Sequence, residues 1–435
     1  MGENSVASSQ LMLQSMRLRD LRAFADTGPV EFAPLNIFIG ANNAGKTTLL
    51  SAIELLFRSL RSNPSDTPLN FSEMPAFASF DAVVRRHWSR KERRPTQIKI
   101  NYSLGVAEAE SVDIEFICEA DPGSGTSHVA EAKYKSSKQH ATLRSKLDSA
   151  GARRFSGKLN KDQYPLGSVL FLGVWPIFRQ RAESRSSNFS AKLFAGPGTV
   201  GARHALEVVK PFRPAPRSYY VLDDPYYDHE ERDLITYLAN LWDRKDERSE
   251  VVKGRIKSAL KLLGLTTEFE VKKTSQKRGP KVLEIRVAPH ATRQKVTIAD
   301  AGFGLSQVLP LIASDARLEK GSFIAYQPEV HLHPYAQSRL ADLFAASVGR
   351  GNQLFVESHS PDLILRLQLL ILRGELKPDD VAVFCFERAS GKNSVRRVAF
   401  DEGAAPNQPW PAGFLDTSLQ TAREMNSLRL GKLAR

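Results

Sequence analysis

Apolar residues recur along this chain with two periods, and the period indicates the kind of element. Residues 35–39 form an apolar run typical of a fully buried strand, and residues 46–57 carry leucine and isoleucine at helical spacing. Residues 97–104 and 112–118 alternate between apolar and polar side chains, which is typical of half-buried antiparallel strands. The pattern therefore predicts a strand and a helix flanked by antiparallel strands.

The middle of the chain predicts two further segments. Residues 121–164 are polar and rich in Ser, Gly and Lys, which favours an insertion with a helix and flexible loops. Residues 228–263 carry apolar positions at helical spacing among many charges, and predict a charged helical pair that projects as an arm.

Strand and helix patterns alternate in the second half, at residues 282–287, 305–313, 323–326, 334–346, 354–357, 362–372 and 381–386. Such alternation indicates a mainly parallel sheet, so the fold class is α/β. We expect the chain to be divided into an N-terminal part, a helical arm, a C-terminal part and an extension, at residues 11–225, 226–280, 281–400 and 401–435.

A phosphate-binding pattern lies between the predicted strand and helix. Residues 40–47 read Gly-Ala-Asn-Asn-Ala-Gly-Lys-Thr and fit G-x-x-x-x-G-K-[ST]. In this pattern Lys46 places a charge near the β and γ oxygens, and the Thr47 hydroxyl can ligate Mg²⁺. We expect ATP or GTP to contact Gly40, Asn42, Asn43, Ala44, Gly45, Lys46, Thr47 and Thr48.

Composition limits the classes of protein. Hydrophobic residues make up 42% of the 435 positions, and no apolar run reaches the length of a membrane helix. Cys118 and Cys385 lie far apart in apolar runs, so two buried thiols are expected rather than a disulfide. We expect a cytoplasmic protein with no membrane partner.

The net charge of +13 is concentrated in two runs, residues 85–94 and a looser run between residues 133 and 161. Either run could contact nucleic-acid phosphates or an acidic partner. A charge run is more often a solvated surface, so both interpretations stay open.

A second helix terminus suited to anions follows in the C-terminal half. Residues 300–310 place Gly302 and Gly304 before a Ser306-Gln307 pair at the start of a predicted helix. Together with residues 16–24, 40–47, 326–334 and 357–360, this segment resembles the ABC-type ATPase heads of the RecF, structural-maintenance-of-chromosomes and OLD-nuclease group. Within that group the chain is similar to stand-alone AAA-family ATPases of bacterial phage-defence operons.

The resemblance implies an ABC-type P-loop ATPase head with ATP and Mg²⁺ as its cofactors. It implies a homodimer or higher oligomer that closes on ATP and opens after hydrolysis. In such a dimer Ser306 acts in trans, His359 is the switch histidine near the γ-phosphate, and Arg19 contacts the nucleotide.

Two positions depart from that family. Tyr326 stands where the family has an acid that holds Mg²⁺ through water, and Gln327 stands where many relatives have a catalytic glutamate. Neither side chain can act as a carboxylate, so we expect slow hydrolysis or a trapped ATP state. Glu329 or Asp300 could supply the missing carboxylate. The candidate catalytic residues are therefore Gln327, Glu329, His359 and Ser306.

Several other residues have plainer interpretations. His331 and His333 lack a nearby third ligand, which favours structural roles over a metal site. Arg213 and Arg217 lie among prolines, and either contact a phosphate or partner, or occupy an exposed loop.

Two functions remain open. In the first, the chain is a sensor or scaffold in antiphage defence, whose heads hold a separate effector protein. In the alternative, it is a DNA-binding recombination or repair ATPase of the RecF type, and the basic runs contact nucleic acid.

Overall fold

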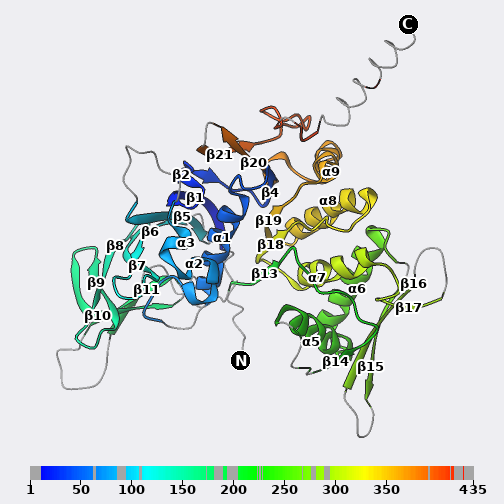
Figure 1. Ribbon diagram of the computed structural model, residues 1–435, viewed down its shortest axis with the longest axis horizontal. Coiled ribbons are helices and arrows are strands. Elements are labelled where there is room, and N and C mark those ends of the chain that lie inside the picture. The colour runs from blue at the N-terminus through cyan, green and yellow to red at the C-terminus, as the bar shows by residue number, and fades with distance from the viewer. Residues whose placement is uncertain are drawn as a thin grey trace, which may run out of the picture.

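The computed structural model describes residues 11–61, 65–85, 95–106, 110–172, 174–180, 190–193, 204–222, 224, 227, 229–266, 268–275, 281–288, 294–389, 392–411, 413–415 and 425. These residues form three sheets with helices between and around them (Figure 1).

The central sheet has six strands in the order β13 (Leu206–Val209), β18 (Ser322–Tyr326), β19 (Gln353–Glu357), β4 (Leu35–Gly40), β20 (Val381–Ala389) and β21 (Lys392–Val398). The first five run parallel and β21 is antiparallel. The predicted mainly parallel core sheet is confirmed. β18 and β19 are buried along their whole length, as expected of parallel strands covered on both faces.

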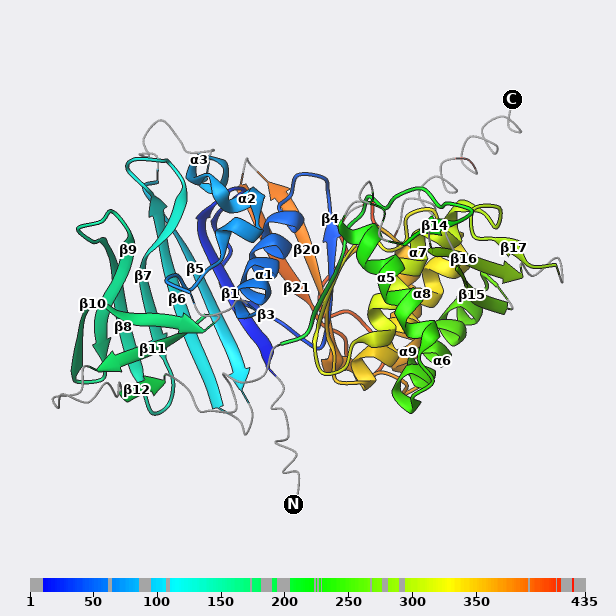
Figure 2. The ribbon, with the colours of Figure 1, turned by 90° about the horizontal axis from the view of Figure 1, so that it is seen from below.

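Helices cover both faces of this sheet. α1 (Lys46–Leu60) packs on one face with Phe38, Ile324 and Phe355. The opposite face packs against α7 (Phe303–Arg317), α8 (Pro334–Gly349) and α9 (Pro361–Leu372). The layers are visible in Figure 2, where α1 lies between the central sheet and a second sheet. Because side chains alternate between the faces, every second residue of a central strand points toward α1.

The second sheet is antiparallel and covers the outer side of α1. Its order is β12-β11-β10-β9-β8-β7-β6-β5-β1-β2, and β3 pairs with β1. Its strands are β1 (Met12–Leu21), β2 (Phe24–Asp26), β3 (Val30–Glu31), β5 (Gln97–Val106), β6 (Glu110–Ala120), β7 (Ser127–Lys135), β8 (His140–Leu147), β9 (Arg153–Leu159), β10 (Asp162–Leu172), β11 (Trp175–Gln180) and β12 (Ser190–Leu193). The short helices η1 (Phe71–Glu73), α2 (Pro75–Ala78) and α3 (Phe80–Val83) lie beside it.

The prediction of a helix and flexible loops at residues 121–164 is wrong. This segment contains β7, β8 and β9 and the start of β10, which extend the antiparallel sheet. Buried Tyr134, Leu143 and Phe155 face the core, while polar neighbours alternate with them. A strand with one solvated face needs only a few apolar residues, so its composition resembles that of a loop.

The helices predicted at residues 228–263 are present as α5 (His229–Asp243) and α6 (Glu247–Leu262), but they do not project as an arm. Leu238, Ile256 and Leu260 are fully buried in the same core as α7. Figure 1 shows both helices beside α7 and a small sheet. That sheet contains β14 (Tyr220–Val221), β15 (Glu268–Ser275), β16 (Lys281–Ala288) and β17 (Val296–Thr297). A short helix η2 (Pro378–Asp380) precedes β20.

The expected cysteine state is confirmed, because Cys118 and Cys385 are both buried and free. Burial raises the pKa of the Cys385 thiol to about 11. Among the described helices, none is both long enough and apolar enough to span a bilayer.

Candidate nucleotide-binding site

The predicted phosphate-binding loop joins β4 to α1. Gly40 and Gly45 have φ angles of 136° and 108°, which favour glycine. A Cβ at Gly40 would lie 2.2 Å from the Phe386 carbonyl oxygen, and one at Gly45 would lie 2.4 Å from the Phe24 ring. Gly45 occupies the N-cap of α1, and within the described chain no side chain caps this helix. The first N–H groups of α1 therefore remain suited to an anion.

The loop exposes some predicted contacts and encloses others. Asn42, Asn43 and Thr47 are exposed, whereas Ala44 and Thr48 are buried. The Lys46 ammonium donates to the carbonyl oxygens of Gly40 at 2.8 Å and Ala41 at 3.0 Å. Burial lowers the pKa of Lys46, and the negative charge of Glu357 opposes that effect. A cation and an exposed hydroxyl thus border the same helix terminus.

Glu357 is the residue of this site that the sequence interpretation missed. It is the last residue of β19 and is 5% exposed. Its Oε2 lies 3.5 Å from the Thr47 hydroxyl, and its Oε1 lies 3.9 Å from the Lys46 nitrogen. Burial raises the pKa of Glu357, whereas the charge of Lys46 lowers it. The available clue was a carboxyl residue at the very end of a predicted central strand.

Tyr326, in the position expected for an acid, turns to a different part of α1. Its hydroxyl donates to Oε2 of Glu54 at 3.1 Å. Glu54 is 1% exposed and also binds Arg58 at 2.8 Å and Lys210 at 2.7 Å. Glu54 follows Thr47 by seven residues, which is about 10 Å along a helix axis. The phenol therefore stabilises the α1 contact instead of facing Thr47.

The other catalytic candidates gather at the ends of β18 and β19. The backbone N–H of Gln327 donates to the Glu357 carbonyl at 2.8 Å. Oε1 of buried Glu329 accepts from the backbone N–H of His359 at 2.6 Å. The His359 side chain is exposed. Partial enclosure, and then the charge of Lys46, lower the pKa of His359, so neutral imidazole is favoured near the loop.

Three predicted residues lie in other surroundings. The Ser306 hydroxyl donates to the Phe303 carbonyl at 2.7 Å in the first turn of α7. Asp300 is exposed and accepts from the Thr297 hydroxyl at 2.6 Å. Arg19 lies on β1, 3.4 Å from the Asp26 carboxylate. These contacts connect none of the three to the loop of the same chain.

Arg213 is not a solvent-exposed loop side chain, because it contacts other elements of its own chain. Its guanidinium donates to the carbonyl oxygens of Gln307 at 2.8 Å, Tyr326 at 3.3 Å and Gln327 at 3.4 Å. Arg213 therefore links α7 to the end of β18. Arg217 instead donates to the Glu231 carboxylate at 3.1 Å.

The structural interpretation of the two histidines agrees with their contacts. His331 packs edge-on against Phe303, with ring centres 4.8 Å apart. His333 caps α8 by accepting from the Tyr335 N–H at 3.3 Å. Within the described ranges, no cluster of three His, Cys, Asp or Glu residues is arranged to hold a metal.

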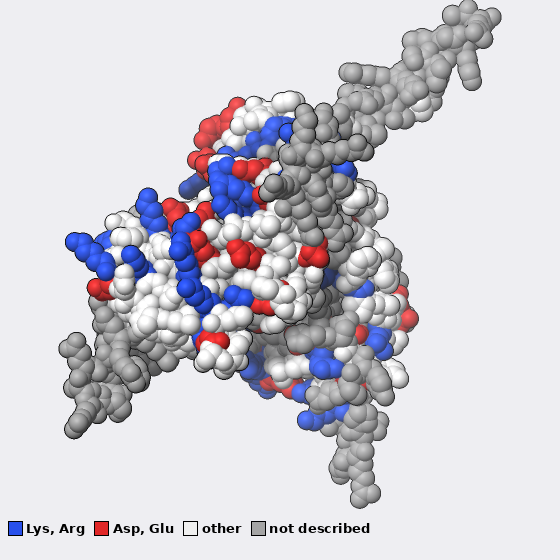
Figure 3. Space-filling view, turned by 60° about the vertical axis from the view of Figure 1, so that its left-hand side comes forward, with Lys and Arg blue, Asp and Glu red and all other residues white. Residues whose placement is uncertain are grey.

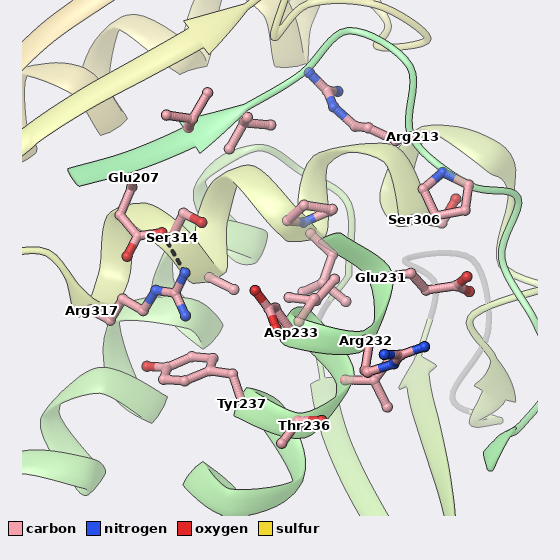
Figure 4. Close-up of a pocket in the computed structure, with 18 of the residues that line it drawn as sticks. Glu207, Arg213, Glu231, Arg232, Asp233, Thr236, Tyr237, Ser306, Ser314 and Arg317 are labelled. Carbon is pink, nitrogen blue, oxygen red and sulfur yellow. Dashed lines mark hydrogen bonds and ion pairs between the residues drawn. The ribbon is translucent and has the colours of Figure 1, made fainter. Parts of the chain in front are cut away.

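A cavity of about 1230 Å³ lies between β13, α5 and α7. Figure 4 shows Ser306 and Arg213 on one side of it, and the ion pair between Arg317 and Glu207 on another. Ser306 thus lines this cavity, while its neighbours Leu305 and Val308 are buried in the core.

A family model for the AAA ATPase domain matches residues 12–162 and 228–364, which is more than half of the chain. The chain belongs to this AAA ATPase family. The match covers the phosphate-binding loop, the segment around Ser306, and the ends of β18 and β19. Nucleotide binding, usually with Mg²⁺, is therefore the property that the family brings to this site.

Several solved structures are similar to this chain at low sequence identity. They include the SMC head domain from Thermotoga maritima, with 11% identity, a TM-score of 0.38, and coverage of 88% of this AAA ATPase and 98% of that chain. The Pyrococcus furiosus Smc head with an extended coiled coil, bound to the C-terminal domain of ScpA, has 10% identity, a TM-score of 0.44, and coverage of 96% and 100%. The recombination mediator RecF with ATPγS has 12% identity, a TM-score of 0.39, and coverage of 90% and 99%. No protein with a curated description matches the sequence.

Proposed function

We propose that this AAA ATPase binds ATP with Mg²⁺ at the loop between β4 and α1. The observation that carries the proposal is the N-terminus of α1, which none of the described side chains caps. The Lys46 ammonium and the exposed Thr47 hydroxyl border this terminus. Backbone N–H groups and an ammonium suit phosphates, and hydroxyl and carboxylate oxygens suit Mg²⁺. The residues present therefore fit both groups. Bound Mg²⁺ would neutralise charge on the phosphates.

Two copies would close around the nucleotide. In one copy, Ser306 lies at the exposed start of α7, where Phe303 is 44% exposed. Gly302 is the N-cap of α7, and none of the described side chains caps it. A second copy could therefore present this terminus to the γ-phosphate, with Ser306 acting in trans and His359 reporting on the phosphate from the copy that binds ATP.

Hydrolysis would be slow in this dimer. Tyr326 is engaged with Glu54, Gln327 cannot accept a proton as a base, and Glu329 accepts from the His359 backbone. A long-lived ATP state suits a sensor or scaffold that holds a separate effector, so we favour this role in antiphage defence. The resemblance to phage-defence ATPases supports the choice of pathway.

Light scattering after size-exclusion chromatography tests the proposal, with and without Mg-ATP and with phosphate release followed in parallel. We expect the mass to double with ATP while little phosphate is released. Rapid phosphate release would contradict the slow-hydrolysis part, and an unchanged monomer mass would contradict the dimer.

The DNA-binding alternative receives less support from the described surface. In the looser basic run, Lys133 pairs with Glu115 at 2.7 Å and Arg153 pairs with Asp121 at 2.6 Å. Figure 3 shows basic and acidic side chains interspersed on this face. Most of the run at residues 85–94 lies outside the described residues. DNA-stimulated ATPase activity, with an affinity that falls steeply with salt, would favour the alternative.

A further inference from the structure

The acid missing from β18 has a counterpart on the adjacent strand. We propose that Glu357 supplies the carboxylate of the Mg²⁺ site, in place of residue 326. This inference rests on the proposed binding of Mg-ATP. Its first support is the placement of Glu357 beside Thr47, at 3.5 Å from carboxylate oxygen to hydroxyl oxygen.

The sheet order explains how the carboxylate can change strands. β19 lies between β18 and β4. β4 leads into the phosphate-binding loop and pairs directly with β19, whereas β18 is one strand further away. Tyr326 and Glu357 are register partners, so both point toward α1. Glu357 is therefore one strand nearer to the loop, by about 4.8 Å in the hydrogen-bonding direction.

The contacts of Tyr326 direct its side chain away from Thr47, so Glu357 is the residue beside the Thr47 hydroxyl. The phenol extends to Glu54, and the Lys210 nitrogen lies 4.8 Å from the centre of the Tyr326 ring. An aromatic side chain held at both its edge and its face is fixed in that direction. Glu357 is then the carboxylate that borders Thr47 among the described contacts.

The local charge balance also favours a divalent cation. Glu357 is 5% exposed and lies at the end of β19. Lys46 lies at 3.9 Å, but its ammonium donates to the Gly40 and Ala41 carbonyls at shorter distances. Buried carboxylates are costly without a close cation. A hard cation held by oxygen atoms would meet that need.

Binding of a fluorescent, non-hydrolysable ATP analogue, in Mg²⁺ and in EDTA, tests the proposal. We expect Mg²⁺ to tighten binding to the unmodified protein. In Glu357→Gln this tightening should fall on the order of tenfold to a hundredfold. Binding in EDTA should be equal or tighter, because the substitution removes a negative charge beside the phosphates. Mn²⁺ electron paramagnetic resonance should detect less bound ion in the variant.

Two variants make the result specific. Tyr326→Phe alters the neighbouring register position and should keep the full Mg²⁺ effect. Lys46→Ala should lose binding in both buffers, which tests the proposed function separately. Circular dichroism checks that each variant is folded.

The outcomes separate the two proposals. An unchanged Mg²⁺ effect in Glu357→Gln overturns the metal role, even if hydrolysis is lost, and would place Glu357 as a base instead. Binding by the unmodified protein that is indifferent to Mg²⁺ overturns only the metal role. Absence of nucleotide binding by the unmodified protein overturns both.

Discussion

Tyr326 and Glu54 are joined by a hydrogen bond of 3.1 Å between the phenol and the carboxylate, although 272 residues separate them. The bond connects the end of β18 to the middle of α1. Arg58 and Lys210 bind the same carboxylate. The residue at the acid position therefore stabilises the attachment of the loop helix to the central sheet.

Tyr326→Phe should lower the free energy of unfolding by about 1 to 3 kcal/mol, because a buried charged acceptor loses its neutral donor. Urea unfolding measures the difference. Tyr335→Phe, at an exposed tyrosine, is the matched control and should change little. Equal stability of the unmodified protein and Tyr326→Phe would show that the bond contributes nothing measurable.

His204 should make stability depend on pH. Its ring stacks on Phe57 with centres 4.9 Å apart, and its Nε2 lies 2.8 Å from the Ser322 hydroxyl. Burial, and then the charge of Arg61, lower the pKa of His204 to about 4. As the pH falls, His204 is protonated in the unfolded state before it is protonated in the folded state. The stability contributed by its neutral ring is therefore present above about pH 6.5 and is lost as the pH falls toward 4.

Urea unfolding of His204→Gln between pH 7 and pH 4 tests this effect. The variant should be less stable at pH 7. Below about pH 6, its free energy of unfolding should no longer fall by the roughly 1.4 kcal/mol per pH unit that His204 contributes in the unmodified protein. His140→Gln, at an exposed histidine, should keep the slope. A parallel pH dependence in the unmodified protein and His204→Gln would exclude His204 as the cause.

Local patterns predicted the loop, β4, α1 and the helices and strands around β18, because each depends on residues close in sequence. Glu357 was missed because its contact with Thr47 depends on which strands are neighbours. Burial of α5 and α6 could not be predicted for a similar reason, since an apolar stripe does not specify its partner. The strands between residues 127 and 164 were misread because their solvated faces are polar.

The Tyr326 contact shows a second limit. A motif comparison marks the residue as a missing acid, which is correct for its chemistry. The hydrogen bond to Glu54 depends on side-chain length and on the distance between β18 and α1, and neither is written in the motif. A residue that departs from a motif can therefore stabilise another part of the structure, as Tyr326 does through Glu54.

Arg213→Lys should weaken the connection between α7 and β18. The guanidinium contacts three backbone carbonyls across the two elements, whereas one ammonium cannot reproduce that planar arrangement. We expect a loss of about 1 to 3 kcal/mol in urea unfolding. Arg217→Lys is the control, because the Arg217 guanidinium pairs with Glu231 and lies over the Tyr227 ring without joining α7 to β18, and it should cost less. A larger loss in Arg217→Lys would contradict the assignment.

Ser306→Arg should separate nucleotide binding from association. Ser306 lies at the exposed start of α7, and its described contacts stay within that turn. A monomer of the variant should therefore bind a fluorescent ATP analogue normally, while the added bulk and charge should block closure by a second copy. Ser338→Arg is a matched control, because Ser338 also donates to a carbonyl three residues earlier, at 2.8 Å in α8. Light scattering with Mg-ATP should detect dimers of the control and monomers of Ser306→Arg. Dimers of both would place the contact between copies on another face.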